Sequence, residues 1–322
     1  MSKAFIKSVT YYIPKENFSN ELVLDLPDNQ KNKIIKKIGI NKKTRAFDDE
    51  TAIDLGIKAA NKLKKCKYFN KIDFILYCTQ SPEYFLPSGS ALIQKKLFPS
   101  KNVGSLDINQ GCSGYVYSLL VAKSLIENDI AKCILIITSD TYSKFIHKND
   151  YSNKSIFGDG ASASIVISEK SKDDYLLKFD YGTDGNGFQN LIYPNSGIKK
   201  SKEEKRLFMN GPEILKFALE QIPKSLQNTI KKNKILKKNI DYFLFHQANK
   251  YIVDVLSKKL NLEDTKVILE INKTGNTTSS SIPIALQGSS EMCFTVLKAS
   301  STMTTPSLVT IPMTYALSTS DH

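Results

Sequence analysis

Short apolar runs alternate with amphipathic segments along most of the chain, and this alternation predicts an α/β protein. Phe74–Cys78 holds five uncharged residues in a row and predicts a short buried strand. Thr51–Lys65 places apolar residues at helical spacing and predicts an amphipathic helix. Another helix is expected to begin at Pro87 with Ser88 as its cap. Further strands are expected at 4–13, 105–109, 133–138, 162–168, 241–246 and 266–271, extended chain at 174–181, and helices at 87–97, 115–127, 211–232, 250–260 and from 279.

The alternation begins again near residue 170, and this repetition favours two similar halves, residues 1–170 and 171–322, over two unrelated domains. No Pro-rich or Gly/Ser-rich linker separates the halves, so we expect them to pack as one body. Residues 287–322 are atypical. They hold one lysine, no asparagine and fourteen Ser or Thr, whereas the preceding sequence is dense in lysine, asparagine and isoleucine. A change this abrupt is unusual within a single fold.

Length and composition describe an ordinary globular protein of 322 residues, 41% hydrophobic and 24% charged. No apolar run approaches the roughly 20 residues that span a bilayer, so no membrane partner is expected. The N-terminal segment lacks the long apolar stretch of a signal peptide. The five cysteines form no CxxC pair, which argues against a disulfide framework or a zinc cluster and for a reducing compartment. We therefore expect a cytoplasmic protein without a metal or other cofactor.

The net charge of +13 raises the question of a nucleic-acid partner. Only Arg45 and Arg206 are arginines, whereas proteins that bind nucleic acids usually rely on arginine forks and interleaved aromatic residues. Nucleic-acid binding is therefore disfavoured. Two interpretations remain: lysines spread over solvated faces, or a positive field that attracts an acidic partner or an anionic substrate.

Cys112 lies where a predicted strand ends and a predicted helix begins, and Gly111 and Gly114 beside it permit a tight turn. A thiol at a helix N-terminus faces unpaired N–H groups and the positive end of the helix dipole, which stabilise the thiolate. Such a cysteine is a candidate nucleophile. The alternative is a small buried hydrophobic residue. We favour that second interpretation for Cys66, Cys78 and Cys133.

Two more residues occupy positions where chemistry is common. His246, one of three histidines, ends a predicted strand, and ligand sites in α/β proteins gather at the carboxyl ends of strands. Asn276 lies in a loop that opens a predicted helix, where its amide could cap the helix or donate a hydrogen bond to an oxyanion. Taken singly, a core imidazole and a helix cap are the commoner roles. A nucleophile, an imidazole and an amide in one chain are more specific together.

Four motifs occur in chain order, namely Gln110–Gly114, Ile156–Ala161, His246–Asn249 and Gly275–Ser279. Together they resemble the condensing enzymes of the thiolase superfamily, specifically β-ketoacyl-ACP synthase III, and the resemblance covers residues 3 to 286. It implies a five-layered αβαβα body built from two similar halves, with the active site between the halves. It also implies a homodimer, with Phe85 and Leu86 near the family's acyl pocket and dimer contact.

The resemblance implies an acyltransferase that uses Cys112, His246 and Asn276. Cys112 would accept an acyl group from an acyl-CoA or acyl-ACP starter. His246 and Asn276 would hydrogen-bond the thioester oxygen of malonyl-ACP while it decarboxylates, and the product would be a β-ketoacyl-ACP. Lys216, Lys258 and Lys259 match the family's basic patch for acyl carrier protein (ACP), and Lys250 is a candidate addition to it.

The chain departs from the acetyl-CoA-primed members of the family at the adenine site, which those members build from a tryptophan and an arginine. This chain has no tryptophan. Lys33 stands near the tryptophan's place, and 150–153 occupies the region of the arginine. Losing the stacking platform removes a contact that selects CoA. We therefore expect a starter that is carried by ACP or is otherwise unusual, in fatty-acid initiation or in a specialised acyl pathway.

The atypical segment 287–322 is the second departure. Family members end with a glycine-rich strand and turn that contributes a backbone donor to the oxyanion hole, and the segment contains no such sequence. A frameshifted or altered C-terminus fits this break. The alternative function is therefore a catalytically impaired relative that acts as an acyl-carrier-binding protein, although the intact Cys-His-Asn set favours an enzyme.

Overall fold

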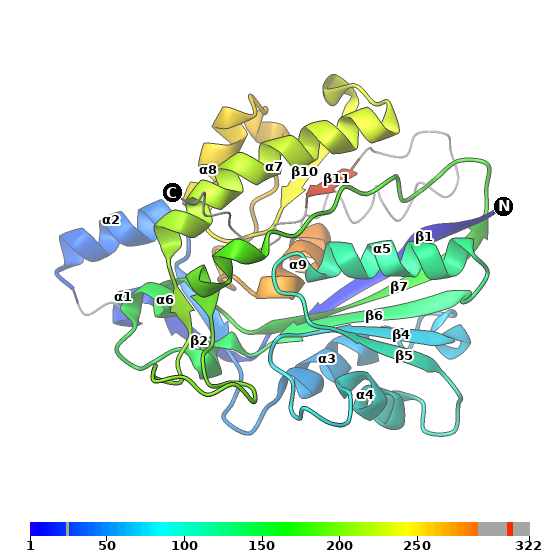
Figure 1. Ribbon diagram of the computed structural model, residues 1–322, viewed down its shortest axis with the longest axis horizontal. Coiled ribbons are helices and arrows are strands. Elements are labelled where there is room, and N and C mark those ends of the chain that lie inside the picture. Colours follow the sequence, from blue (N-terminus) through cyan, green and yellow to red (C-terminus); the bar gives the residue numbers. More distant parts are fainter. Residues whose placement is uncertain (24–25, 289–307, 312–322) are drawn as a thin grey trace.

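The computed structural model describes residues 1–23, 26–288 and 308–311 (Figure 1). Its strands are β1 Ser2–Tyr12, β2 Glu16–Ser19, β3 Lys42–Arg45, β4 Phe74–Cys78, β5 Gly104–Ile108, β6 Cys133–Asp140, β7 Gly160–Lys170, β8 Leu191–Ile192, β9 Phe208–Met209, β10 Tyr242–Phe245 and β11 Leu308–Ile311. Its α-helices are α1 Asn20–Val23, α2 Asp28–Ile38, α3 Ala52–Asn61, α4 Gly89–Leu97, α5 Gly114–Glu127, α6 Tyr151–Ile156, α7 Gly211–Asn233, α8 Lys250–Lys259 and α9 Ser281–Gly288.

Five strands of the first half form one mixed sheet in the order β1-β7-β6-β4-β5. β4 pairs in parallel with β5 and β6, while β7 runs antiparallel to β6 and β1. The carboxyl ends of β4, β5 and β6 therefore meet at one edge of the sheet. The chain leaves that edge toward Cys112 after β5, and Asp140 closes β6 there.

Both faces of this sheet are covered by helices, because successive side chains of a buried strand point to opposite faces. On β6, Leu135 and Ile137 pack with residues of α3 and α4, whereas Ile134 and Ile136 pack with residues of α5 and α9. The sheet is therefore buried on both sides, which explains the uncharged run of β4 as well.

The second half adds two more layers, because successive side chains of β10 also point to opposite faces. On β10, Leu244 joins the cluster of α5 and α9, while Phe243 and Phe245 join that of α7 and α8. β11 pairs in parallel with β10. Figure 1 shows the order of layers from α3 and α4 through the five-stranded sheet, α5 with α9, and β10 with β11, to α7 and α8. This is the αβαβα order that the motifs imply.

The predicted strand at 266–271 forms only partly. Its side chains alternate as in a strand, with Ile268 and Leu269 in different clusters. In the described residues its pairing is a single bridge from Val267 to Phe243. The reason is Gln247, whose amide donates to the carbonyl of Ile268 at 3.2 Å and accepts from the N–H of Glu270 at 2.9 Å. A side chain thus replaces the neighbouring strand. The extended segment 174–181 likewise forms no strand among the described residues.

The predicted cap residue of α4 has the predicted position but not the capping hydrogen bond. Ser88 occupies the N-cap position, but its side chain makes no capping hydrogen bond. The carboxylate of Asp107 does so instead, accepting from the N–H groups of Gly89 at 2.7 Å and Ser90 at 2.8 Å. A carboxylate on a neighbouring strand satisfies the first N–H groups of α4 and also suits the positive end of its dipole.

Candidate active site

Cys112 is buried in the turn that joins β5 to α5. The turn is closed by a hydrogen bond from the N–H of Gly114 to the carbonyl of Gly111, 2.8 Å long. The Cys112 side chain belongs to the apolar cluster of the second half, together with Phe245 and Ala248, which flank His246 in the sequence. The nucleophile predicted on the first half therefore lies against the segment of the second half that carries the predicted histidine.

Gly114 allows the start of α5 to approach β4. A Cβ at this position would lie 2.2 Å from Sγ of Cys78 and 3.4 Å from Cβ of Ser279. The Cys78 thiol donates to the carbonyl of Gln110 at 3.1 Å, and burial raises its pKa far above the usual range. Burial also raises the pKa of Cys133 to about 12. Both thiols are protonated packing groups at neutral pH, as expected for them.

Asn276 is held by backbone pairing between two of the four motifs. Its N–H donates to the carbonyl of Ile156 at 2.8 Å, and its carbonyl accepts from the N–H of Gly158 at 3.0 Å. A Cβ at Gly158 would lie 1.9 Å from the carbonyl oxygen of Thr274, so only glycine fits there. Gly275 has φ of +72°, a conformation that glycine adopts at little cost. The glycines of these motifs thus bring Asn276 against the first half.

Asp159 secures the same turn from the other side. Its carboxylate accepts from the N–H of Ala46 at 2.8 Å, and from the N–H and hydroxyl of Ser143 at 2.9 and 2.5 Å. Burial raises the pKa of Asp159 to about 6. The carboxyl group is a structural anchor for the Gly158–Gly160 turn.

The amide of Asn276 is divided between two roles. Its Oδ1 accepts from the N–H of Thr278 at 2.9 Å, which caps the turn that leads into α9. Among the described residues its Nδ2 makes no hydrogen bond. Capping by the oxygen therefore leaves the amide N–H groups available to a ligand, and both roles considered for this residue are compatible.

His246 is buried immediately after β10, and its ring is bonded on one side only. Nδ1 lies 2.6 Å from the hydroxyl oxygen of Ser281, the first residue of α9. Nε2 is buried and has no hydrogen-bond partner among the described residues. Burial lowers the pKa of His246 to about 3, so the imidazole is neutral at pH 7.

The surroundings of Ser281 favour one tautomer of that neutral ring. The Ser281 oxygen already accepts from the N–H of Gln247 at 3.3 Å. Nδ1 of His246 is the one acceptor within reach of the Ser281 hydroxyl among the described residues. A Ser281 hydroxyl that donates to Nδ1 places the imidazole proton on Nε2, whereas the reverse bond leaves the hydroxyl proton without an acceptor among the described residues. The favoured tautomer places an N–H donor, rather than a base, at the open side of the ring. Nothing in the sequence distinguishes Ser281 from the serines before it.

The four predicted carrier-binding lysines lie on α7 and α8. Lys216, Lys258 and Lys259 are exposed. Lys250 forms an ion pair with Asp254 one turn further along α8. Its charge is therefore partly balanced within the helix, which makes it the weakest of the four for an acidic partner.

The predicted adenine region holds a lysine, a helix cap and one exposed aromatic side chain, Tyr151. Lys33 is exposed on α2, and Asp150 caps α6 by accepting from the N–H of Asn153 at 3.0 Å. The ring of Tyr251, next to Lys250, is covered by the ammonium group of Lys37 at 4.4 Å from its centroid. An aromatic face that already holds a cation offers less to an adenine ring.

Large apolar side chains are exposed in the loop before α4 and on the edge strand β5. Phe85 is 75% exposed and Leu86 is 86% exposed, and Leu106 of β5 is partly exposed as well. Edge strands and clustered apolar side chains are both typical of protein interfaces.

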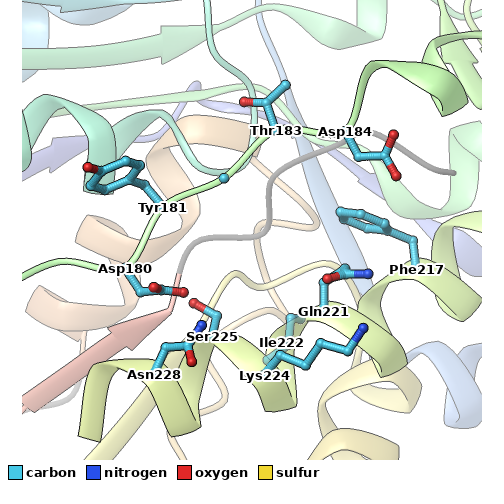
Figure 2. Close-up of a pocket in the computed structure, with 11 residues that line it drawn as sticks. Asp180, Tyr181, Thr183, Asp184, Phe217, Gln221, Ile222, Lys224, Ser225 and Asn228 are labelled. Atoms are coloured by element: carbon cyan, nitrogen blue, oxygen red, sulfur yellow. The ribbon is translucent and has the colours of Figure 1, made fainter. Parts of the chain in front are cut away.

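A pocket of about 320 Å³ is lined by described residues that do not include the three candidates (Figure 2). The segment 180–184 forms one wall, and Phe217, Gln221 and Ser225 from α7 line the other. Its described lining includes neither Cys112 nor His246, and we assign it no role in the chemistry.

Comparison with known proteins identifies the family. Sequence profiles of 3-oxoacyl-[acyl-carrier-protein] synthase III match residues 106–185, and those of its C-terminal part match residues 230–292. A β-ketoacyl-[acyl-carrier-protein] synthase III of Campylobacter jejuni is 35% identical over 296 residues, 90% of each chain. The chain belongs to the 3-oxoacyl-ACP synthase III family.

Solved structures of family members agree with this assignment. A 3-oxoacyl-(acyl-carrier-protein) synthase III superposes with a TM-score of 0.85 at 35% identity, over 89% of this chain and 90% of the other. The Burkholderia xenovorans enzyme gives 0.84 at 31% identity, over 89% and 86%. The resemblance drawn from the motifs is confirmed, and so are the thiolase-like α/β fold and the class of condensing acyltransferase. The impaired carrier-binding relative is not favoured.

Several expectations remain predictions for this synthase III member, among them the three catalytic residues, the carrier-binding lysines and the division into halves at residue 170. Most of 287–322 lies outside the described residues, and Cys293 is among those positions. Among the described residues no helix has the length and apolar character needed to cross a membrane. They also contain no group of three or more His, Cys, Asp or Glu placed to hold a metal ion.

Proposed function

We propose that this enzyme joins an acyl group carried on Cys112 to the two-carbon unit of malonyl-ACP, with His246 and Asn276 as hydrogen-bond donors. The observation that carries the proposal is the Ser281–His246 bond, because it favours a neutral imidazole with its proton on Nε2. A neutral N–H donor suits a reaction that develops negative charge on oxygen.

The first step transfers the acyl group. The Cys112 thiol gives up its proton, and the thiolate attacks the carbonyl carbon of the starter thioester. The carbon–sulfur bond to the carrier breaks, and the carrier sulfur leaves as a thiolate that takes up a proton in place of the one Cys112 lost. Cys112 lies just before the first turn of α5, and this position supports its role because the N–H groups there stabilise a thiolate.

The second step forms the carbon–carbon bond. Malonyl-ACP loses CO2, and the electron pair of the broken bond becomes an enolate whose oxygen accepts from Nε2 of His246 and Nδ2 of Asn276. The enolate carbon attacks the acyl-Cys112 thioester, and the Cys112 thiolate leaves. The product is a β-ketoacyl-ACP. Each donor of this kind typically contributes about 2.7–4 kcal/mol to such a barrier.

ACP is the proposed carrier partner, docked on the exposed lysines 216, 258 and 259, with Lys250 as a lesser contributor. The starter is proposed to arrive on ACP or in another unusual form rather than as acetyl-CoA. The absence of tryptophan and the cation already seated on Tyr251 support this preference.

A homodimer is the proposed assembly, with a second copy covering Phe85 and Leu86 in the loop before α4. Exposures of 75% and 86% for two such side chains in a single chain support it. Light scattering of the purified protein tests this, and a monomer at micromolar concentration would contradict it. The cytoplasm is the proposed location, which the cysteines without a CxxC pair support.

The reaction is tested by incubating the protein with radiolabelled acyl-ACP or acyl-CoA, followed by malonyl-ACP. We expect label on the wild-type protein, its transfer to a β-ketoacyl product when malonyl-ACP is added, and no labelling of Cys112→Ala. Labelling that survives Cys112→Ala would exclude Cys112 as the nucleophile.

A further inference from the structure

Asp140 is a fully buried carboxyl group that the proposed chemistry does not use. It closes β6 at the edge of the sheet that faces the candidate site, with 0% of its surface exposed. Burial raises its pKa, and none of its partners among the described residues is a cation. A buried carboxyl without a cationic partner is costly to keep, so its contacts are of interest.

Its two oxygens hold two different parts of the site. Oδ1 accepts from the N–H of Gln80 at 2.8 Å and from the hydroxyl of Thr79 at 3.4 Å, both just after β4. Oδ2 accepts from the hydroxyl of Ser279 at 2.6 Å and from that of Thr278. One carboxyl group therefore ties the end of β4 to the segment that follows Asn276.

The segment on the Oδ2 side positions both predicted donors. The N–H of Thr278 donates to Oδ1 of Asn276 and thereby sets the direction of its amide. Ser281, on the next turn, bonds His246. Between them Ser280 bonds Thr138 of β6 at 2.9 Å. Asn276 and His246 are thus oriented by one short stretch of chain, 276–281.

Thr278 needs stabilising hydrogen bonds because its backbone conformation is unfavourable. Its φ is +50°, in the left-handed region that a β-branched residue rarely adopts. Residues persist in that region only when their surroundings fix them, and they gather at functional sites. The hydrogen bonds of Thr278 and Ser279 to Asp140 supply that fixation.

Gln80, a partner of Oδ1 of Asp140, contacts the turn that carries Cys112. Gln80 packs against Gly111, where a Cβ would lie 2.6 Å from Oε1 of Gln80. The Gln80 side chain is held in turn by the hydroxyl of Tyr142, at 2.5 Å. Asp140 therefore lies between the turn that carries Cys112 and the stretch 276–281.

We propose that Asp140 is a positioning residue of the condensation step, which orients Asn276 directly through Thr278 and His246 through the stretch 276–281. The hydrogen-bond partners of Asp140 among the described residues belong to the end of β4 and to Thr278 and Ser279, so it acts through those residues. The inference rests on the proposed function of Cys112, His246 and Asn276.

The test separates the two half-reactions in the full-length protein. Acyl transfer to Cys112 is followed with labelled starter, and condensation is followed by adding malonyl-ACP to the isolated acyl-enzyme. Asp140→Asn keeps the shape, and its amide oxygen still accepts from the N–H of Gln80, but its NH2 group cannot accept from the hydroxyls of Thr278 and Ser279. We expect condensation to slow roughly 10- to 100-fold, as misplaced catalytic groups do. Acyl transfer should stay within about threefold, because the Gln80 bond survives.

Ser279→Ala is the second variant, which removes one donor and leaves the carboxyl in place. It should show the same selective loss in smaller degree, and it decides the question if Asp140→Asn does not fold. The double variant, Asp140→Asn with Ser279→Ala, should condense no more slowly than Asp140→Asn alone. Both changes remove the same hydrogen bond between Ser279 and Asp140.

Asp107→Asn is the matched control, since Asp107 is also a carboxylate at a strand end that accepts two N–H groups. It should lower thermal stability without changing the ratio of condensation to acyl transfer. The inference is overturned if the Asp140 and Ser279 variants slow both half-reactions equally, or slow neither. A wild-type protein that takes no label on Cys112 overturns the proposed function instead.

Discussion

The hydroxyl oxygen of Ser281 lies 2.6 Å from Nδ1 of His246, so the first residue of α9 orients the residue that follows β10. The two elements are held together by apolar packing, with Leu244 of β10 and Ile282 of α9 in one cluster. The direction of the imidazole is therefore set by the core of the protein. This contact gives the first prediction.

Ser281→Ala should slow condensation about tenfold while leaving acyl transfer to Cys112 nearly unchanged. Without the hydroxyl, the neutral ring has no partner that holds its proton on Nε2, and losing about 1.4 kcal/mol of stabilisation corresponds to that factor. Single-turnover rates of the two half-reactions measure it. The control is Ser124→Ala, which removes a helix hydroxyl bonded to the carbonyl of Leu120 on the exposed side of α5. Equal effects of the two changes would contradict the role of Ser281.

Gly114→Ala should destabilise the protein and slow acyl transfer to Cys112. The new methyl group would lie 2.2 Å from Sγ of Cys78, and overpacking of this kind costs about 1–3 kcal/mol. The start of α5 must shift to relieve the clash, and Cys112 shifts with it. Urea unfolding and labelling rates measure both effects.

Cys78→Ala introduced into the Gly114→Ala protein provides the internal check, because it removes the sulfur that the methyl group meets. The double variant should be more stable than Gly114→Ala alone. Gly197→Ala is the neutral control, since nothing lies within 4 Å of a Cβ at that position. A double variant no better than the single one would show that the clash is not the cause.

The pH dependence of stability should carry a contribution from His246. Its folded pKa is about 3, against a usual 6.5. Between these values the unfolded chain binds a proton that the folded protein does not, so the contribution falls as pH falls from about 6.5 toward 3. The difference in free energy of unfolding between the wild type and His246→Asn should therefore shrink from pH 7.5 to pH 5. A difference that stays constant would contradict a buried neutral imidazole.

Asp159 should change the pH dependence of stability in the direction opposite to His246, and it serves as a comparison. Its folded pKa is about 6 against a usual 3.8, so the folded protein holds a proton that the unfolded chain lacks between those values. Its contribution to stability grows on acidification through that window. Asp159→Asn should accordingly make the acid loss of stability steeper than in the wild type, and a shallower loss would contradict the sign.

Sequence patterns predicted the elements that local composition determines. β4 has the predicted bounds, and α7 differs from its prediction by one residue at its end. Cys112 and His246 lie at the ends of elements, as their motifs suggested. Contacts between distant residues were not predictable. Asp107 replaced Ser88 as the cap of α4, and Gln247 replaced a strand beside 266–271. Both replacements depend on which side chain the tertiary fold brings to an unsatisfied backbone group.

The same reason hid the residues that support the site. Ser281 is 35 positions from His246 in the sequence, and Asp140 is 139 positions from Ser279. A serine within a run of serines, or an aspartate at the end of an apolar strand, carries no local sign of such a partner. Motifs could therefore indicate candidate residues for the site, but only the packing of α9 and β6 shows what orients them.

The preference for the starter carrier gives a further prediction. Acyl-ACP should label Cys112 faster than acetyl-CoA at equal concentration, because the chain has no tryptophan and Tyr251 already holds the ammonium of Lys37. Lys37→Ala uncovers that ring and should improve labelling by acetyl-CoA more than labelling by acyl-ACP. Efficient priming by acetyl-CoA in the wild type would contradict the proposed preference for ACP-bound starters.

The carrier surface gives the last prediction. Reversing both charges at the end of α8, with Lys258→Glu and Lys259→Glu, should raise the KM for malonyl-ACP and leave the condensation rate at saturation nearly unchanged. Exposed charge pairs contribute about 0.2–1 kcal/mol each, so an increase of several-fold is expected at low salt. The increase should shrink as salt rises, since the screening length falls from about 10 Å at 0.1 M to about 3 Å at 1 M. Lys64→Glu with Lys65→Glu changes the net charge equally on exposed lysines that follow α3, in the outer layer opposite α8. If that control raises KM as much as the α8 pair, the effect comes from net charge and the carrier does not dock on α8.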